Sequence, residues 1–299
     1  MKDEEEKQVI IFYHRVDLDG KCSGAIAKKG YPDAEMYGIN YGDVFPWEKI
    51  KEGMRIVMVD FSLPLLEMIK LKNNTDFIWI DHHKTALDEM AEYLDVDQIP
   101  EKDSDKRIMG IQRDGVGACV LTWEFFFGRP IPPGVRLLGE YDVWNHRDPD
   151  TLPFQYGMRS IENHPESENW DLVFSGDLDV FGTIKEAGET ILRWVDKDNE
   201  KTAQSLCFAT ELDGLRLLAA NRGPTNSKLF DSVLDPDKYD AVCAFFWRPS
   251  IAKWNVSLFA GRDGVDVGSV CKARGGGGHE GAAGFTCDEL PFGLNGVGN

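Results

Sequence analysis

The stretch Ile80-Asp81-His82-His83-Lys84 decides the fold, because it places an acid and two imidazoles directly after a short apolar run at residues 77–80. That run is rich in β-branched and aromatic residues and predicts a buried strand. In open α/β sheets, ligands bind at the carboxyl ends of the strands. We therefore expect a buried sheet whose strand ends carry the polar side chains of a binding site.

Two other predicted strands end in the same way. The strand that begins at residue 9 leads into a segment with His14, Asp17 and Asp19, and a later strand leads into Asp60. Carboxylate oxygens and imidazole nitrogens are suitable ligands for Mn²⁺, Mg²⁺ or a similar ion. One polar strand end arises easily by chance, whereas three of them favour a single metal site.

The composition limits the class of partner. The chain has 299 residues, enough for two domains or one large domain, and 51 acidic against 33 basic residues give a net charge of −18. This surplus of acidic residues argues against non-specific binding to long nucleic acid and suits a protein that binds divalent cations. Six scattered cysteines without a C-x-x-C pair favour reduced thiols in a cytoplasmic protein. No apolar run is long enough for a membrane span, so we expect no membrane partner.

Predicted strands alternate with helices in the N-terminal part, which favours a parallel sheet covered on both faces. Residues 96–113 predict an exposed irregular connection, and residues 145–180 predict charged turns. Residues 183–209 predict one long helix, because apolar residues recur at helical spacing among charges. The expected fold class is α/β, with an N-terminal parallel-sheet domain at 1–182, a helical linker at 183–209 and a smaller C-terminal α/β domain at 210–299.

Several candidate acids also have an ordinary structural explanation. Asp17 suits a turn that caps a helix, and Asp60 suits a helix N-cap or a loop. Asp142 lies among aromatic and apolar residues, where an acid is costly unless it is paired or bound to a metal. A buried salt bridge with Arg136 or Arg147 explains Asp142 as well as a metal does.

The adjacent histidines His82 and His83 are a stronger signal than any single acid. Two neighbouring side chains point apart on a strand, but both can reach one site from a loop. One imidazole can then bind a metal while the other contacts a substrate. An exposed histidine pair without a function is the alternative.

A second set of candidate residues lies near the C-terminal end. The glycine run at 275–278 exposes backbone N–H groups without side chains in the way, and such loops cradle anions. A flexible linker is the alternative, but a linker belongs between domains, whereas this run lies in an apolar context. The candidate substrate ligands here are Arg262, Arg274, Gly276, Gly277, Gly278 and His279.

The order of these motifs resembles that of a DHH-family phosphoesterase with the DHH-associated C-terminal domain. Four family elements occur in order, namely the His/Asp segment at 14–20, Asp60, Asp81-His82-His83 and Asp142. The glycine-rich segment at 275–285 resembles the signature of the associated domain, so the resemblance covers nearly the whole chain. Three stretches are most similar to the oligoribonuclease (nano-RNase) branch: Val59-Asp60-Phe61-Ser62, Asp81-His82-His83-Lys84-Thr85-Ala86 and Tyr141-Asp142-Val143-Trp144.

The resemblance implies two Mn²⁺ ions in the first domain, with Mg²⁺ or Co²⁺ as alternatives. One ion would be held by His14, Asp17 and Asp60, and the other by Asp19, Asp60, His82 and Asp142. The nano-RNase branch commonly has a cysteine at the position of Asp17, which makes Asp17 the weakest of these ligands. The resemblance also implies that His83 contacts the phosphoryl oxygens and that Asp81 orients the loop.

The expected activity is hydrolysis of short single-stranded oligonucleotides to mononucleotides by water that two metal ions activate. Other substrates with the same metal chemistry stay open, namely cyclic dinucleotides, a nucleoside bisphosphate or pyrophosphate, as does a phosphatase acting on a protein or a small metabolite. A non-catalytic nucleotide-binding protein on this fold is the alternative from a different class. The sequence leaves open whether the chain acts as a monomer or a homodimer.

Overall fold

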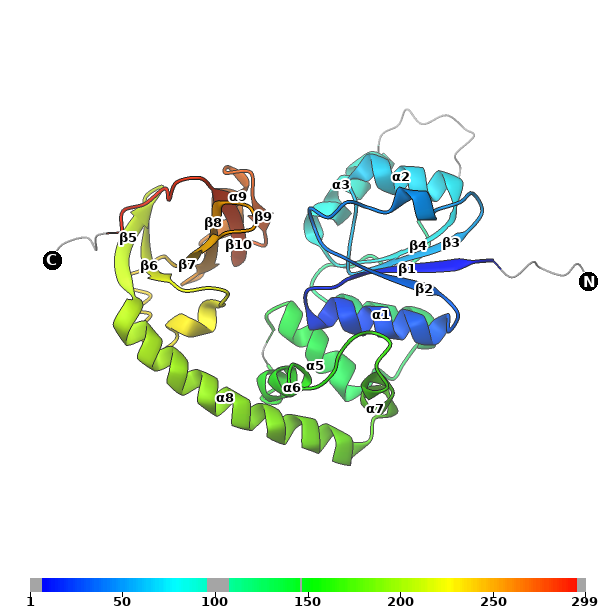
Figure 1. The fold of residues 1–299 in the computed structure, drawn as a ribbon, viewed down its shortest axis with the longest axis horizontal. Helices are drawn as coiled ribbons and strands as arrows, with labels where there is room; N and C mark the ends of the chain where they lie inside the picture. Colours follow the sequence, from blue (N-terminus) through cyan, green and yellow to red (C-terminus); the bar gives the residue numbers. More distant parts are fainter. Residues whose placement is uncertain (1–6, 96–107, 146, 295–299) are drawn as a thin grey trace, which may run out of the picture. The chain divides into compact units, whose positions relative to one another are not determined.

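The computed structural model describes residues 7–95, 108–145 and 147–294. The chain divides into two compact units, Met1–Leu192 and Arg193–Asn299, which we call unit 1 and unit 2. Each unit has its own sheet and helices (Figure 1). The predicted fold class, α/β with an N-terminal parallel sheet, is confirmed. In the described residues, no helix has the length and apolar character needed to cross a membrane.

Unit 1 contains a four-stranded sheet in which all neighbouring strands are parallel. Its strands are β1 (Val9–His14), β2 (Glu35–Ile39), β3 (Arg55–Val59) and β4 (Asp76–Ile80), in the order β2-β1-β3-β4. The chain leaves β1 for β2 on one side and then crosses to β3 on the other side. The carboxyl ends of β1 and β3 therefore form a topological switch point, where ligands bind in such sheets.

Alternate residues of the strands build two separate cores. Phe12, Met58 and Trp79 face one layer, where α2 (Leu65–Asn74) and α3 (Lys84–Asp95) cover the sheet. Trp79 is 1% exposed, and full burial of a side chain of this kind contributes roughly 1.5–3 kcal/mol. The sheet is thus buried on this face, as the continuous apolar runs predict.

The opposite face packs against helices α1 (Leu18–Gly30) and α4 (Ala118–Phe127). Ala27 of α1 and Leu121 of α4 are buried against alternate residues of the sheet. A further core lies behind these helices, where α1 packs against α4 and α5 (Pro133–Asp142). The start of α1 therefore lies between the sheet edge and the helical layer.

The segment predicted as charged turns, residues 145–180, instead contains two helices, α6 (Thr151–Met158) and α7 (Asn169–Ser175). Their apolar residues, among them Phe154 and Trp170, are buried in the helical core of unit 1. The prediction was wrong because these apolar residues are few among many charges, and a short helix gives a weak periodic signal.

The predicted exposed connection at 96–113 falls in part outside the described residues, which resume at Ile108. The part that is described runs beside β4 as an irregular neighbour. The amide of Trp79 donates to the carbonyl of Met109 at 2.8 Å, and the amide of Arg113 donates to the carbonyl of Asp81 at 3.1 Å. Ile108 is buried. This segment covers an otherwise open strand edge, which apolar periodicity alone does not predict.

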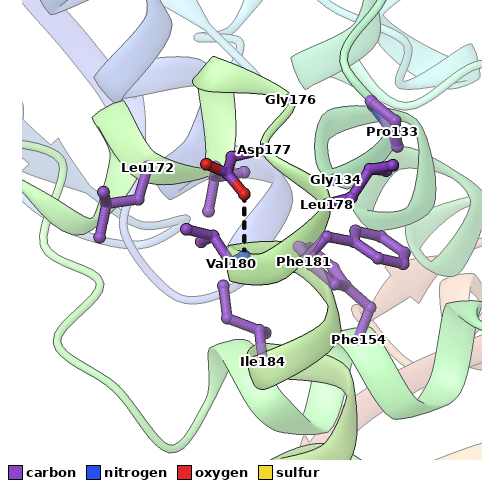
Figure 2. Close-up of a pocket in the computed structure, with 11 residues that line it drawn as sticks. Pro133, Gly134, Phe154, Leu172, Gly176, Asp177, Leu178, Val180, Phe181 and Ile184 are labelled. Atoms are coloured by element: carbon purple, nitrogen blue, oxygen red, sulfur yellow. Dashed lines mark hydrogen bonds between the residues drawn. The ribbon is translucent and has the colours of Figure 1, made fainter.

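The long predicted helix is α8, which spans Leu178–Leu206 rather than residues 183–209. It begins earlier because Asp177 Oδ1 accepts hydrogen bonds from the amides of Asp179 and Val180 and caps the helix. Figure 2 shows this start beside a hollow lined mainly by apolar side chains of α5, α6, α7 and α8. The hollow contains none of the predicted site residues. The boundary between the units falls inside α8, and the predicted domain limits stay a prediction.

Unit 2 is built on a six-stranded sheet in the order β5-β6-β7-β8-β10-β9, in which only β6 and β7 are parallel. Apolar runs in the sequence predict strands at 215–220, 241–246 and 254–260, and all three are present as β6, β7 and β8. The sequence also predicts helices near 227–233 and 265–273, where the structure has a 3-10 turn and the short helix α9. The elements are β5 (Phe208–Leu212), β6 (Leu215–Asn221), the turn Ser227–Phe230, β7 (Ala241–Arg248), β8 (Lys253–Ala260), α9 (Val267–Lys272), β9 (Gly277–Gly278) and β10 (Ala282–Cys287).

Gly20 in α1 allows the helix to begin directly under β1, because a Cβ atom there would lie 2.1 Å from the carbonyl oxygen of His14. We expect Gly20→Ala to lower the free energy of unfolding by about 1–3 kcal/mol, since backbone must shift. Urea unfolding measures this change. Gly182→Ala in α8 is the matched control: its Cβ meets open space, so it should stabilise by about 0.5–1 kcal/mol. Equal changes in the free energy of unfolding for the two variants would contradict the close approach of Gly20 to the carbonyl of His14.

Candidate metal centre

Three polar strand ends meet at the carboxyl edge of the unit 1 sheet. His14 is the last residue of β1, Asp60 follows β3 directly, and the Asp81-His82-His83 stretch follows β4. Asp60 has a φ of 53°, in the left-handed region that is uncommon for a residue other than glycine. Its amide donates to the carbonyl of Ile80 at 2.9 Å, which ties the strained residue to β4. Strain of this kind clusters at functional sites.

Helix α1 supplies two further acids. Asp17 is the N-cap of α1 and accepts a hydrogen bond from the amide of Gly20 at 2.8 Å, so the structural explanation considered for it holds. Asp19 is 2% exposed and accepts from the amides of Ala118 and Cys119 at 2.6 and 2.8 Å. These amides open α4, where the helix dipole favours a negative charge.

Asp142 is the last residue of α5 and reaches the same place from the helical layer. Its carboxylate Oδ2 lies 3.2 Å from His82 Nε2. The alternative partner Arg136 instead binds Glu140 and Asp148, at 2.5 and 2.7 Å. A carboxylate at the C-terminal end of a helix faces the negative end of the helix dipole, so Asp142 requires a compensating positive charge.

The side chains gather into two groups that share Asp60. In the first group, His14 Nδ1 lies 2.7 Å from Asp17 Oδ2 and 3.6 Å from Asp60 Oδ2. In the second group, His82 Nε2 lies 3.3 Å from Asp60 Oδ1 and 3.8 Å from Asp19 Oδ2. The two carboxylate oxygens of Asp60 thus face different groups, which is the arrangement of a bridging ligand.

Asn40, just after β2, was not singled out by the sequence, although it orients His14. Its Oδ1 lies 3.1 Å from His14 Nε2 and also accepts from the amide of Tyr41 at 2.9 Å. A hydrogen bond from Nε2 to this amide oxygen leaves Nδ1 of His14 as the atom with a lone pair. Metal-binding histidines are commonly oriented by such an outer contact. No sequence signal marks this residue, because the contact is set by the sheet order.

Asp81 is fully buried and holds the histidine loop in shape. Its Oδ1 accepts from the amide of His82 at 2.8 Å and lies 2.7 Å from Nδ1 of His83. Because the carboxylate accepts, the proton is on Nδ1 of His83. Asp81 therefore positions the loop, and His83 is brought to within 4.0 Å of Asp60 Oδ1.

The crowding of charges shifts the pKa of several groups in the cluster. Burial raises the pKa of Asp19 to about 7, and the charge of Asp60 adds to this shift. Burial disfavours the charged form of His82, but the nearby carboxylates of Asp60 and Asp19 raise its pKa to about 10. Burial also disfavours the charge on Asp60, yet His14 and His82 hold its pKa below the usual range. Burial and the charges of Asp19 and Asp60 raise the pKa of Asp142 well above its ordinary value.

The cluster fits a divalent cation. His14 Nδ1 and Asp60 Oδ1 are buried and make no hydrogen bond within the described part of the chain. Among the described residues, none of the site's carboxylates is paired with a lysine or an arginine. Three sets of side chains bring ligand atoms within 4.8 Å of one another: His14, Asp17 and Asp60; Asp19, His82 and Asp142; and Asp60, Asp81, His82 and His83. Mixed carboxylate and imidazole donors suit a divalent transition ion.

The glycine run in unit 2 is more structured than the sequence predicts. The amides of Gly275 and Gly276 donate to the carbonyls of Lys272 and Cys271 at the end of α9, at 3.1 and 3.0 Å. A Cβ on Gly276 would lie 2.1 Å from the carbonyl oxygen of Gly284, so this position needs glycine for packing. Two of the amides expected to cradle an anion are therefore engaged within unit 2.

The other predicted substrate ligands also have partners within unit 2. Arg274 binds Asp213 at 2.7 Å, and Arg262 donates twice to Asp240, at 2.9 and 2.6 Å. The amide of His279 donates to the carbonyl of Ala282, the first residue of β10, at 2.8 Å. The assignment of Gly276, Gly277, Gly278 and these three residues as substrate ligands stays a prediction.

Comparison with known proteins supports the fold. No protein-family model matches the chain. An uncharacterised protein of Acanthamoeba polyphaga mimivirus is 27% identical over 241 residues, which make up 77% of this chain and 52% of that protein. The chain thus spans about half the length of this curated relative.

Two solved structures resemble the chain over most of its length. One is the DHH domain of a member of a family of ribosomal proteins, with a TM-score of 0.54, 13% identity and coverage of 93% of this chain and 82% of that one. The other is a pGpG-specific phosphodiesterase from Vibrio cholerae, with a TM-score of 0.50, 14% identity and coverage of 94% and 93%. These similarities show a fold shared with DHH proteins.

The ion pair of Arg262 with Asp240 predicts that Asp240 stabilises the fold of unit 2. Hydrogen bonds from Arg216 and from Arg262 hold the pKa of Asp240 far below its ordinary value. Its ionisation therefore stabilises the fold above about pH 4, the unfolded value, and this contribution falls as the pH drops further. We expect Asp240→Asn to cost about 1–2 kcal/mol at pH 7 in urea unfolding, and less at pH 3. The control Asp288→Asn, at a side chain that is 81% exposed, should cost little, and a cost for Asp240→Asn that does not vary with pH would contradict this role.

Proposed function

We propose that the protein is a metal-dependent phosphoesterase that hydrolyses short oligonucleotides to mononucleotides. The observation that carries the proposal is the position of Asp60. Its two oxygens face two separate groups of histidine and aspartate side chains at the switch point of a parallel sheet. A shared carboxylate between two such groups is the arrangement that suits a pair of divalent ions.

The ligand sets follow from the two groups. We assign His14, Asp17 and Asp60 to one Mn²⁺ ion, and Asp19, Asp60, His82 and Asp142 to the other, with Mg²⁺ or Co²⁺ as substitutes. Such a pair would lower the pKa of a water molecule and would stabilise the negative charge that develops on a phosphoryl group. The two backbone amides that bind Asp19 fix this carboxylate before any ion arrives.

His83 is assigned to the substrate rather than to a metal. Its Nδ1 is bound to Asp81, so the proposed contact with a phosphoryl oxygen falls to Nε2. Burial disfavours the imidazolium, but Asp81 reverses the effect and raises the pKa of His83. A protonated His83 donates to the phosphoryl group and stabilises the charge that builds up on it. Asp81 is then a positioning residue.

Two observations favour a short nucleic acid as the substrate. The net charge of −18 repels a long polyanion. One of the structures with the shared fold is, by its name, a phosphodiesterase specific for pGpG, so this fold can host a site for a dinucleotide. We further propose that the segment with Gly276, the exposed strand β9 (Gly277–Gly278) and His279 binds an anionic group of the substrate, with Arg262 and Arg274 as further charges.

Several other substrates are alternatives to a short oligonucleotide. Cyclic dinucleotides, nucleoside bisphosphates and pyrophosphate need the same metal chemistry, and a non-catalytic nucleotide-binding protein needs only the fold. We also propose that the protein belongs to the nano-RNase branch and that it is located in the cytoplasm. A panel of these compounds with Mn²⁺-loaded protein separates the candidates directly.

The metal assignment predicts two bound Mn²⁺ ions per chain. Asp60→Ala removes a ligand from both groups, so we expect it to abolish tight binding of both ions. Asp17→Ala removes one ligand from one group and should weaken a single ion, by about 10- to 100-fold. Calorimetric titration of chelator-treated protein measures both effects. Asp171→Ala, at a side chain that is 71% exposed, is the control and should bind like wild type. A single ion in wild type, or equal losses in both variants, would contradict the shared ligand.

The substrate assignment predicts initial rates that fall as single-stranded oligonucleotides lengthen from two to twenty-four nucleotides. His279→Ala should raise KM about tenfold with little change in kcat, because a contact of equal strength in the ground state and the transition state affects binding alone. The control is His164→Ala, at another exposed histidine. Rates that rise with length, or a preference for a cyclic dinucleotide, a bisphosphate or pyrophosphate, would overturn the assignment.

A further inference from the structure

The end of helix α5 presents an aromatic side chain that the metal centre does not use. Trp144 is 56% exposed, although tryptophan is a large apolar residue. Its φ of 54° is unusual for a bulky side chain, and the backbone is held there by a hydrogen bond from its amide to the carbonyl of Tyr141. This left-handed residue ends α5, where the amide of Asn145 donates to the carbonyl of Glu140 at 2.8 Å, so the fold holds the indole ring in an exposed position.

Trp144 belongs to an aromatic cluster that includes a cation. Its ring contacts the ring of Tyr141 edge to face, at a centroid distance of 5.8 Å. Arg159 Nη2 donates to the hydroxyl of Tyr141 at 3.2 Å, and the guanidinium lies 5.3 Å from the ring centres of both Tyr141 and Tyr156. Arg159 is exposed, and no carboxylate among the described residues pairs with it. In a chain with a charge of −18, such a cation is suited to an anionic ligand.

The cluster adjoins the candidate metal centre through the chain itself. Asp142, whose carboxylate lies 3.2 Å from His82 Nε2, stands between Tyr141 and Trp144 in the sequence.

A second cation comes from α1, where Lys21 stands two positions after the candidate metal ligand Asp19 in the sequence. Its Nζ donates at 2.8 Å to the side chain of an asparagine that itself bonds the carbonyl of Met158, the residue before Arg159. Aromatic rings and positive charge thus border an acidic cluster.

We propose that Trp144 and Tyr141 form a subsite that stacks a nucleobase of the substrate, and that Arg159 binds a phosphate of the same nucleotide. The inference rests on the proposed phosphoesterase function and specifies its substrate as a nucleotide rather than a simple phosphate ester. An exposed indole accepts any base on its face, and an arginine held on aromatic rings is pre-organised for a phosphate. The residues of the subsite all belong to unit 1, whereas the glycine run belongs to unit 2.

The test compares a dinucleotide with its abasic analogue, which has the same phosphodiester and sugars but no bases. Trp144→Ala should raise KM for the dinucleotide about tenfold and leave KM for the abasic analogue unchanged, because only the stacking contact is lost. Arg159→Gln should raise KM for both. Trp247→Ala, at an exposed tryptophan of unit 2, is the matched control and should change neither. Equal effects of Trp144→Ala on both substrates, or no effect, would overturn the subsite.

A binding measurement separates this inference from the proposed function. Titration of the metal-free protein with the dinucleotide should quench the tryptophan fluorescence of wild type. The Trp144→Phe variant should lose the quenching that comes from Trp144, whereas the control Trp247→Phe should be quenched like wild type. If wild type quenches in this way but hydrolyses neither compound with Mn²⁺, the phosphoesterase proposal fails and the subsite stands. If Trp144→Phe quenches like wild type, the subsite is refuted whatever the activity.

Discussion

Repulsion among carboxylates at one sheet edge is the constraint on which the unit 1 site depends. Asp19, Asp60 and Asp142 converge on His82, and burial with this crowding raises the pKa of Asp19 to about 7. The fold offsets part of the cost with the amides at the start of α4. The imidazoles offset another part, but only while they carry protons. Divalent cations would replace those protons and neutralise the cluster more completely.

The strands and the meeting of their polar ends could be predicted from the sequence, because both follow from local rules. Apolar runs with β-branched residues define β1, β3 and β4, and parallel strands bring their carboxyl ends to one edge. His14 and Asp60 could therefore be paired from the sequence alone. Asp142 is different: its local pattern suited a salt bridge as well, and only the family resemblance favoured the metal.

Contacts that depend on tertiary packing could not be predicted. The amides that bind Asp19 come from a helix about a hundred residues further along the chain, and Asn40 reaches His14 only because β2 lies beside β1. In unit 2, the sequence predicts an open glycine loop, whereas Gly276 is required for a close approach to β10. The ion pair of Arg262 with Asp240 likewise joins residues that no local pattern connects.

Anomalous diffraction from crystals of Mn²⁺-loaded protein tests the central claim, that Asp60 is shared by two metal ions. The account predicts two manganese peaks in each chain, one beside His14 and Asp17 and the other beside His82 and Asp142, with Asp60 in contact with both and about 3.5–4 Å between them. A single peak, or two peaks of which only one contacts Asp60, would contradict it.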